Sequence, residues 1–221
     1  MPRESKTALK ERAQEISRRL RGRYPNECAL EFSSPWELLV ATILSAQCTD
    51  EKVNEVTGVL FARYETVADY ANAEPAVFEQ EVRPTGFFRN KTKSILGTAK
   101  AILEQFGGEV PATMEQMLLL PGVARKTANV VLGTAFGVPS GIAVDTHVSR
   151  LALRMGLTPA QKTKTINTDR IEQDLMALIP QKDWVHFGHA MIWHGRRVCD
   201  ARKPQCEGCL TADICPRRGV G

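Results

Sequence analysis

The chain has 221 residues, a formal net charge of +4 and 43% hydrophobic residues. This length allows one large or two small domains with a real core, and the mild basic excess permits nucleic-acid binding without requiring it. Residues 1–25 are charged throughout, and no apolar run reaches about 18 residues, so neither an export signal nor a membrane partner is expected. We expect a protein of the cytoplasm or nucleoid.

The spacing of apolar residues and chain breakers predicts an all-α protein. Alternating runs of Val, Ile and Thr are lacking, and Gly and Pro interrupt the chain at intervals that suit helices. The first helix is expected over 6–23, where apolar residues share one face. Ser34 is expected to cap a second helix that begins at Pro35. Further helices are expected over 50–64, 66–71, 75–82, 90–106, 142–156, 168–179 and 184–194.

A helical hairpin is predicted over about 113–136. Its arms are 113–119 and 125–136, and the turn between them, Pro121-Gly122-Val123, is so short that the two arms must pack together. A helix start offers unpaired N–H groups and a positive dipole end, which suit a phosphate. Lys126 lies in the first turn of the second arm, where the dipole and Arg125 favour a neutral amine. For this segment alone, an ordinary solvated lysine is the alternative.

The six cysteines indicate a metal site rather than a disulfide framework. Cys28 and Cys48 stand alone and are expected to behave as small buried apolar residues. The other four follow the spacing C-x6-C-x2-C-x5-C near the C-terminus. Zinc normally uses two separated C-x2-C pairs, so this spacing favours a [4Fe-4S] cluster over zinc. The four predicted ligands are Cys199, Cys206, Cys209 and Cys215.

A cluster held by four cysteines has no open position for a substrate, so we expect it to fix the loop 199–215. That loop carries Arg202 and Lys203. A fixed basic loop is suited to contact a phosphate, and we expect both side chains to do so.

Three features together closely resemble the endonuclease III family, which are helix-hairpin-helix DNA glycosylases with an iron-sulfur cluster. They are LPGVARKTA at 120–128, VDTH at 144–147 and the four-cysteine tail. The resemblance begins near Phe32 and continues through LSAQCTD, GFFRNK and GEVP to Cys215. It therefore covers nearly the whole chain.

The resemblance implies that Lys126 is the catalytic nucleophile and Asp145 its partner. Loss of a base from C1′ of the sugar builds positive charge there, which a nearby carboxylate stabilises. Attack by the amine then gives a Schiff base, from which the 3′ phosphate is eliminated. The family function is therefore removal of damaged bases, mainly oxidised pyrimidines, followed by cleavage of the abasic site. The other interpretation of Asp145, a helix N-cap, is compatible with this role.

The resemblance also implies a set of residues that contact double-stranded damaged DNA. Gln47 would fill the gap left by an extruded nucleotide, and Phe87 stands where the family inserts a second, apolar side chain. The alternatives are a local helix-end role for Gln47 and a core position for at least one of Phe87 and Phe88. In the hairpin turn, Gly122, Val123 and Ala124 would bind the DNA backbone.

Three positions depart from the family pattern. Ala124 replaces a second glycine and would cost about 1 kcal/mol if that position needed a positive φ. Gly141 is one extra residue before Asp145, and Leu118 replaces a glutamate of some members. The last two could alter the cleft and the lesion preference.

The resemblance predicts a two-lobed monomer. One lobe, 28–139, would carry the hairpin, and the other, 1–27 with 140–221, would carry the cluster. Lys126 and Asp145 are expected to face each other across the cleft between lobes. The alternatives are a monofunctional mismatch glycosylase of the same superfamily, which lacks such a lysine, and a non-catalytic DNA-binding iron-sulfur protein.

Overall fold

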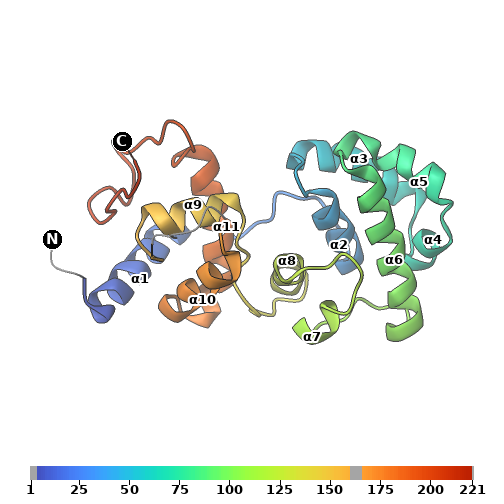
Figure 1. Ribbon diagram of the computed structural model, residues 1–221, viewed down its shortest axis with the longest axis horizontal. Coiled ribbons are helices and arrows are strands. Elements are labelled where there is room, and N and C mark those ends of the chain that lie inside the picture. The colour runs from blue at the N-terminus through green and yellow to red at the C-terminus, as the bar shows by residue number, and fades with distance from the viewer. Residues whose placement is uncertain (1–3, 160–165, 221) are drawn as a thin grey trace. The chain divides into compact units, whose positions relative to one another are not determined.

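The computed structural model describes residues 4–159 and 166–220. Within these ranges every regular element is a helix, which confirms the predicted all-α class (Figure 1). The chain divides into two compact units, Cys28–Ser140, here called the hairpin unit, and Met1–Glu27 with Gly141–Gly221, here called the cysteine unit. None of the described helices combines the length and the apolar character that a membrane crossing requires.

The hairpin unit packs around two helices, the buried α2 and the long α6. As predicted, Ser34 caps α2 by accepting a hydrogen bond from Glu37 N at 3.2 Å, and Pro35 begins the helix. Helices α4 and α5 pack against α6, and α8 packs against α2. The elements are α2 (Pro35–Leu44), α3 (Asp50–Arg63), α4 (Val67–Asn72), α5 (Pro75–Val82), the 3-10 helix η1 (Arg83–Thr85), α6 (Phe88–Phe106), α7 (Met114–Met117) and α8 (Arg125–Ala135).

The cysteine unit joins the first helix to the last part of the chain. Helix α11 packs against both α1 and α9, as the blue, yellow and orange ribbons of Figure 1 show. Ile16, Leu151 and Phe187 are fully buried between these helices. The elements are α1 (Lys6–Arg23), α9 (Thr146–Arg154), α10 (Thr168–Leu178), the 3-10 helix η2 (Gln181–Asp183) and α11 (Trp184–Arg197).

Two predicted helices are shorter in the structure. The prediction of a helix over 142–156 was wrong at its start, because Asp145 adopts an extended backbone and caps α9 from Thr146 onward. The first arm of the hairpin is the short helix α7 rather than 113–119, because Thr113 is its N-cap and the chain turns at Leu118. In both places the apolar periodicity of the sequence extends beyond the helix, before the start of α9 and after the end of α7.

Candidate active site and cysteine centre

The hairpin turn depends on Gly122. Its φ is +74°, and a Cβ placed there would lie 2.4 Å from both Cβ and Oγ of Ser94 on α6. The turn is held to the same helix by Thr98, whose Oγ1 donates to Pro121 O at 2.5 Å. Only glycine combines this backbone conformation with so close an approach. Helix α6 therefore fixes where α8 begins.

The start of α8 exposes backbone donors. Ala124 is the N-cap with φ −90° and ψ 166°, so the alanine at this position carries no backbone strain. No side chain caps this helix start. Within the described part of the chain, the N–H groups of Gly122 and Ala124 have no acceptor, whereas Val123 N donates to Leu120 O at 3.2 Å. Two of the three predicted turn residues thus present a free donor.

Lys126 follows directly in the first turn of α8. Its side chain is exposed, and among the residues described here it makes no ion pair or hydrogen bond. Its amine is therefore beside the exposed donors of the turn and accessible from solvent.

Asp145 is the N-cap of α9 in the cysteine unit. Its Oδ1 accepts a hydrogen bond from Val148 N at 2.8 Å, which fixes the half-buried carboxylate at the helix start. The structural interpretation made from the sequence is therefore correct. It leaves Oδ2 without a donor in the described ranges, so the same carboxylate keeps an oxygen for another role.

Gln47 and Phe87 share an unusual backbone conformation. Their φ angles are 53° and 48°, and among described residues only Arg217 also has a positive φ without being glycine. Such a conformation is strained for residues with side chains and is typical of functional positions. Both side chains are exposed, and 60% of the Phe87 surface is accessible. A core position is therefore excluded for Phe87, whereas Phe88 packs against the core of the hairpin unit, so the prediction that at least one of the two lies in the core is confirmed.

Sequence reasoning missed Lys91. This lysine is buried on α6, and its Nζ donates to Leu44 O and to Thr85 O, both at 2.7 Å. A signal was present, because Lys91 lies one helical turn before the buried Ile95 on the same face of the helix.

The cysteine centre is a cavity in the cysteine unit that all four cysteines line, together with side chains that include Arg154 and His194. Arg154 from α9 donates to Asp200 O at 2.6 Å and to Ala201 O at 2.8 Å, and its Nη1 lies 3.4 Å from Cys199 Sγ. These bonds hold the loop that follows α11 against α9.

The buried His194 forms part of the wall of this cavity. Its Nε2 is 3.5 Å from Cys209 Sγ, and its Nδ1 is 3.0 Å from the hydroxyl of Tyr24. Burial lowers the pKa of His194 to about 4, so the ring is neutral at pH 7. Burial also raises the pKa of Cys215.

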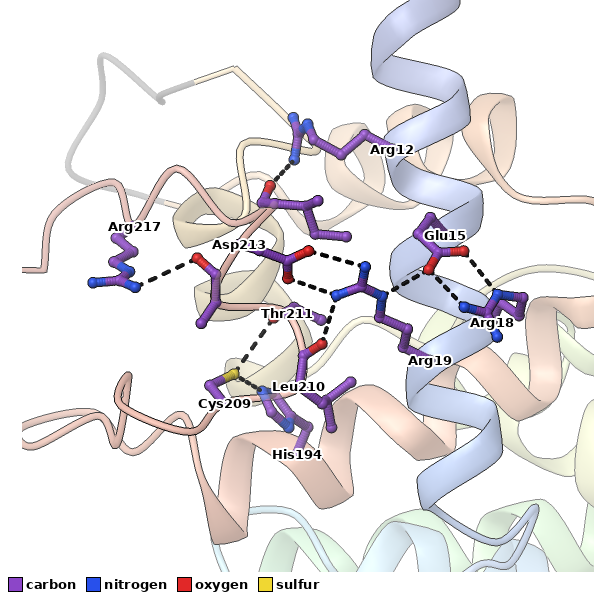
Figure 2. A network of polar contacts seen from close by, with 12 residues as sticks. Arg12, Glu15, Arg18, Arg19, His194, Cys209, Leu210, Thr211, Asp213 and Arg217 are labelled. Atoms are coloured by element: carbon purple, nitrogen blue, oxygen red, sulfur yellow. Dashed lines mark hydrogen bonds and ion pairs between the residues drawn. The ribbon is translucent and has the colours of Figure 1, made fainter.

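Helix α1 holds the cysteine loop from the other side (Figure 2). Arg19 pairs with the carboxylate of Asp213 at 2.6 and 3.0 Å and donates to Leu210 O at 2.9 Å. Its Nε is 2.7 Å from Glu15, which orients the guanidinium. Planar guanidinium groups suit such fixed, bidentate contacts. The loop is therefore attached to two helices by arginines.

The remaining predicted residues of the loop, Arg202 and Lys203, are exposed. Their backbone N–H groups donate to Asp200 Oδ1 at 2.8 and 3.1 Å, and these bonds lower the pKa of Asp200. Asp200 thus orders the backbone while both basic side chains stay in solvent. Cys28 and Cys48 are half-buried against the core of the hairpin unit.

Comparison with known proteins identifies the class. A model of the HhH-GPD superfamily of base excision DNA repair proteins matches residues 40–181. The chain is 54% identical to the endonuclease III of Synechocystis sp., across 94% of this chain and 93% of the relative. It is 41% identical to that of Escherichia coli, across 91% and 93%.

Solved structures agree. The structure of a trapped endonuclease III–DNA covalent intermediate matches with a TM-score of 0.87 and 39% identity, over 94% of this chain and 96% of that one. A non-covalent endonuclease III–DNA complex matches with the same TM-score at 40% identity, over 94% and 95%. The chain belongs to the endonuclease III family within the HhH-GPD superfamily.

The geometry of the turn gives a first prediction. Replacing Gly122 by alanine should destabilise the hairpin unit by clearly more than the cost of a left-handed alanine alone, about 1 to 2 kcal/mol, because Ser94 must also move. Gly107→Ala is the matched control, since Gly107 has φ +63° but no atom within 4 Å of an added Cβ. Thermal unfolding measures both. Equal melting temperatures for the two variants would show that the turn tolerates a side chain.

Proposed function

We propose that Lys126 is the nucleophile of a DNA glycosylase and abasic-site lyase that acts on oxidised pyrimidines in double-stranded DNA. The main support is the exposed amine of Lys126 in the first turn of α8, which lies beside the free N–H groups of Gly122 and Ala124. The match to a trapped endonuclease III–DNA covalent intermediate supports this assignment. The protein would work as a monomer in the cytoplasm, associated with the nucleoid.

The proposed chemistry requires a neutral amine next to the reacting sugar. The Lys126 nitrogen forms a bond to C1′ as the bond from C1′ to the damaged base breaks, and the proton that the amine loses passes through Asp145 to the departing base. Ring opening gives a Schiff base between Lys126 and C1′, which accepts electrons. Loss of a proton from C2′ then expels the 3′ phosphate. Water finally releases the lysine.

Asp145 is proposed to stabilise the positive charge that develops on the sugar and to accept the proton of the attacking amine. Its hydrogen bond to Val148 N supports this role, because it holds the carboxylate in one orientation without using Oδ2. Preorganised charge of this kind stabilises a transition state without needing to reorient.

The hairpin turn is proposed to bind a DNA phosphate. The N–H groups of Gly122 and Ala124 would donate to the phosphate oxygens, and the dipole of α8 would add attraction. Val123 contributes less as a donor, since its N–H already bonds within the turn. Gln47 and Phe87 are proposed to enter the duplex where the damaged nucleotide leaves it, which offsets part of the cost of extrusion.

The four cysteines are proposed to hold a [4Fe-4S] cluster, the cofactor of this family. The residues fit in type and number, because four cysteine side chains line one cavity and four thiolates are the usual ligands of such a cluster. Bound there, it would supply four metal–sulfur links that fix the loop. Iron and sulfide analysis distinguishes it from zinc.

The nucleophile assignment predicts the behaviour of Lys126→Ala. Borohydride reduces a Schiff base to a permanent link, so the wild-type protein should become trapped on DNA that contains an abasic site. The variant should lose this trapping while its affinity for the same DNA stays within about threefold, because one exposed charge is removed. Lys100→Ala, which removes an exposed lysine from α6, should trap normally. Trapping that persists in Lys126→Ala would place the nucleophile elsewhere.

The two roles of Asp145 predict different results for two substitutions. Asparagine caps a helix as well as aspartate does, so Asp145→Asn should keep the wild-type stability but lose activity by about 100-fold or more. Asp145→Ala should lose the activity and also about 1 kcal/mol of stability. Single-turnover rates and thermal unfolding measure these effects. An active Asp145→Asn would limit Asp145 to capping.

The loop assignment predicts a change in the salt dependence of DNA binding. Replacing both Arg202 and Lys203 by alanine should lower the slope of log affinity against log salt by about 1 to 2, at roughly 0.9 per lost phosphate contact. The variant should retain the wild-type iron and sulfide content. Lys6→Ala with Lys10→Ala removes the same charge from exposed positions of α1 and is the control. An equal slope in both double variants would exclude these side chains from the DNA interface.

A further inference from the structure

Lys91 is the one buried lysine among the described residues, with 4% of its surface accessible. A buried ammonium group is unfavourable unless its protons are used in hydrogen bonds. Lys91 meets this requirement with two backbone carbonyls and no carboxylate, Leu44 O and Thr85 O, each 2.7 Å from Nζ. The ammonium group of Lys91 therefore joins the backbone at Leu44 to the backbone at Thr85.

Each of these two carbonyls lies at the end of a helix and receives a hydrogen bond from Lys91. Leu44 is the last residue of α2, and Thr85 is the last residue of η1. The final carbonyls of a helix have no partner within it. In the described part of the chain, no backbone N–H donates to either oxygen. Removing the amine would leave both carbonyls unpaired in a buried place, which is costly.

The two joined segments lead directly to Gln47 and Phe87. Gln47 follows Leu44 by three residues, and Phe87 follows Thr85 by two. Both residues have a positive φ. Their side chains are exposed, so packing around the side chains does not hold them in this conformation. Lys91 also bonds to the second segment through its backbone, since Lys91 N donates to Phe87 O at 3.1 Å. Strained residues of this kind persist only when the structure around them holds them in place.

We propose that Lys91 is a positioning residue that ties the Gln47 and Phe87 segments together through one ammonium group, so that both side chains enter the duplex as a unit. This inference rests on the proposed function, because it needs those side chains to enter DNA. Lys91 itself touches neither the substrate nor the reacting atoms. Its contribution is confined to the extrusion of a nucleotide from a paired duplex.

The test compares two substrates that differ in whether extrusion is needed. One is a duplex with a single abasic site, and the other is a single strand with the same site. Lys91→Met has a similar length but no donor, so it should cleave the duplex about tenfold or more slowly and the single strand at the wild-type rate. Lys91→Arg keeps the charge and donors and should recover part of the duplex rate.

Two controls separate positioning from a general loss of stability. Ile95→Ala removes a fully buried side chain one turn further along α6 and leaves the Lys91 bonds in place. Its duplex and single-strand rates should keep the wild-type ratio. A 2-aminopurine base opposite the abasic site should report the insertion of Gln47 by its fluorescence in the wild type and in Ile95→Ala, but not in Lys91→Met.

A double-mutant cycle completes the test. In a chain that already carries Gln47→Ala and Phe87→Ala, Lys91→Met should cause little further loss on the duplex, because its effect passes through those two side chains. Equal losses of Lys91→Met on both substrates, or additive losses in the cycle, would overturn the inference. A wild-type protein that cleaves neither substrate would instead contradict the proposed function.

Discussion

The close approach of Gly122 to Ser94 determines where the hairpin turn meets α6. A Cβ at position 122 would lie 2.4 Å from Cβ and Oγ of Ser94, so only glycine fits there. This contact, with the bond from Thr98 to Pro121, places the start of α8 on α6. Helix α6 also carries Lys91, which joins the Gln47 and Phe87 segments. One helix thus positions the start of α8, which carries Lys126, and the segments that carry Gln47 and Phe87.

In the cysteine unit, the Asp145 cap and two arginines have the equivalent role. Asp145 caps α9 with one oxygen and keeps the other. The arginines Arg19 and Arg154 bind backbone carbonyls of the cysteine loop from α1 and α9. These contacts order the loop through the protein alone, and a cluster would add metal–sulfur links to them. The exposed Arg202 and Lys203 are therefore carried on an ordered backbone.

Local signals made much of the fold and part of the site predictable. The all-α class, the helix over Lys6–Arg23 and the cap at Ser34 follow from short-range patterns, and the structure confirms them. The start of α9 was missed, since apolar periodicity continues through the cap. The absence of strain at Ala124 could not be known, because the residue type alone does not give the backbone angles, and here φ is −90°. Lys91 was missed because its partners are backbone carbonyls, one of them on Leu44, which is 47 residues away in the sequence.

The proposed reaction depends on a bond between the Lys126 nitrogen and C1′ of the damaged nucleotide. Mass spectrometry of the borohydride-reduced protein–DNA adduct, after digestion of both components, locates this bond. We expect the sugar remnant on Lys126 and on no other residue. A remnant on another amine, or efficient strand cleavage without any adduct, would contradict the proposed reaction.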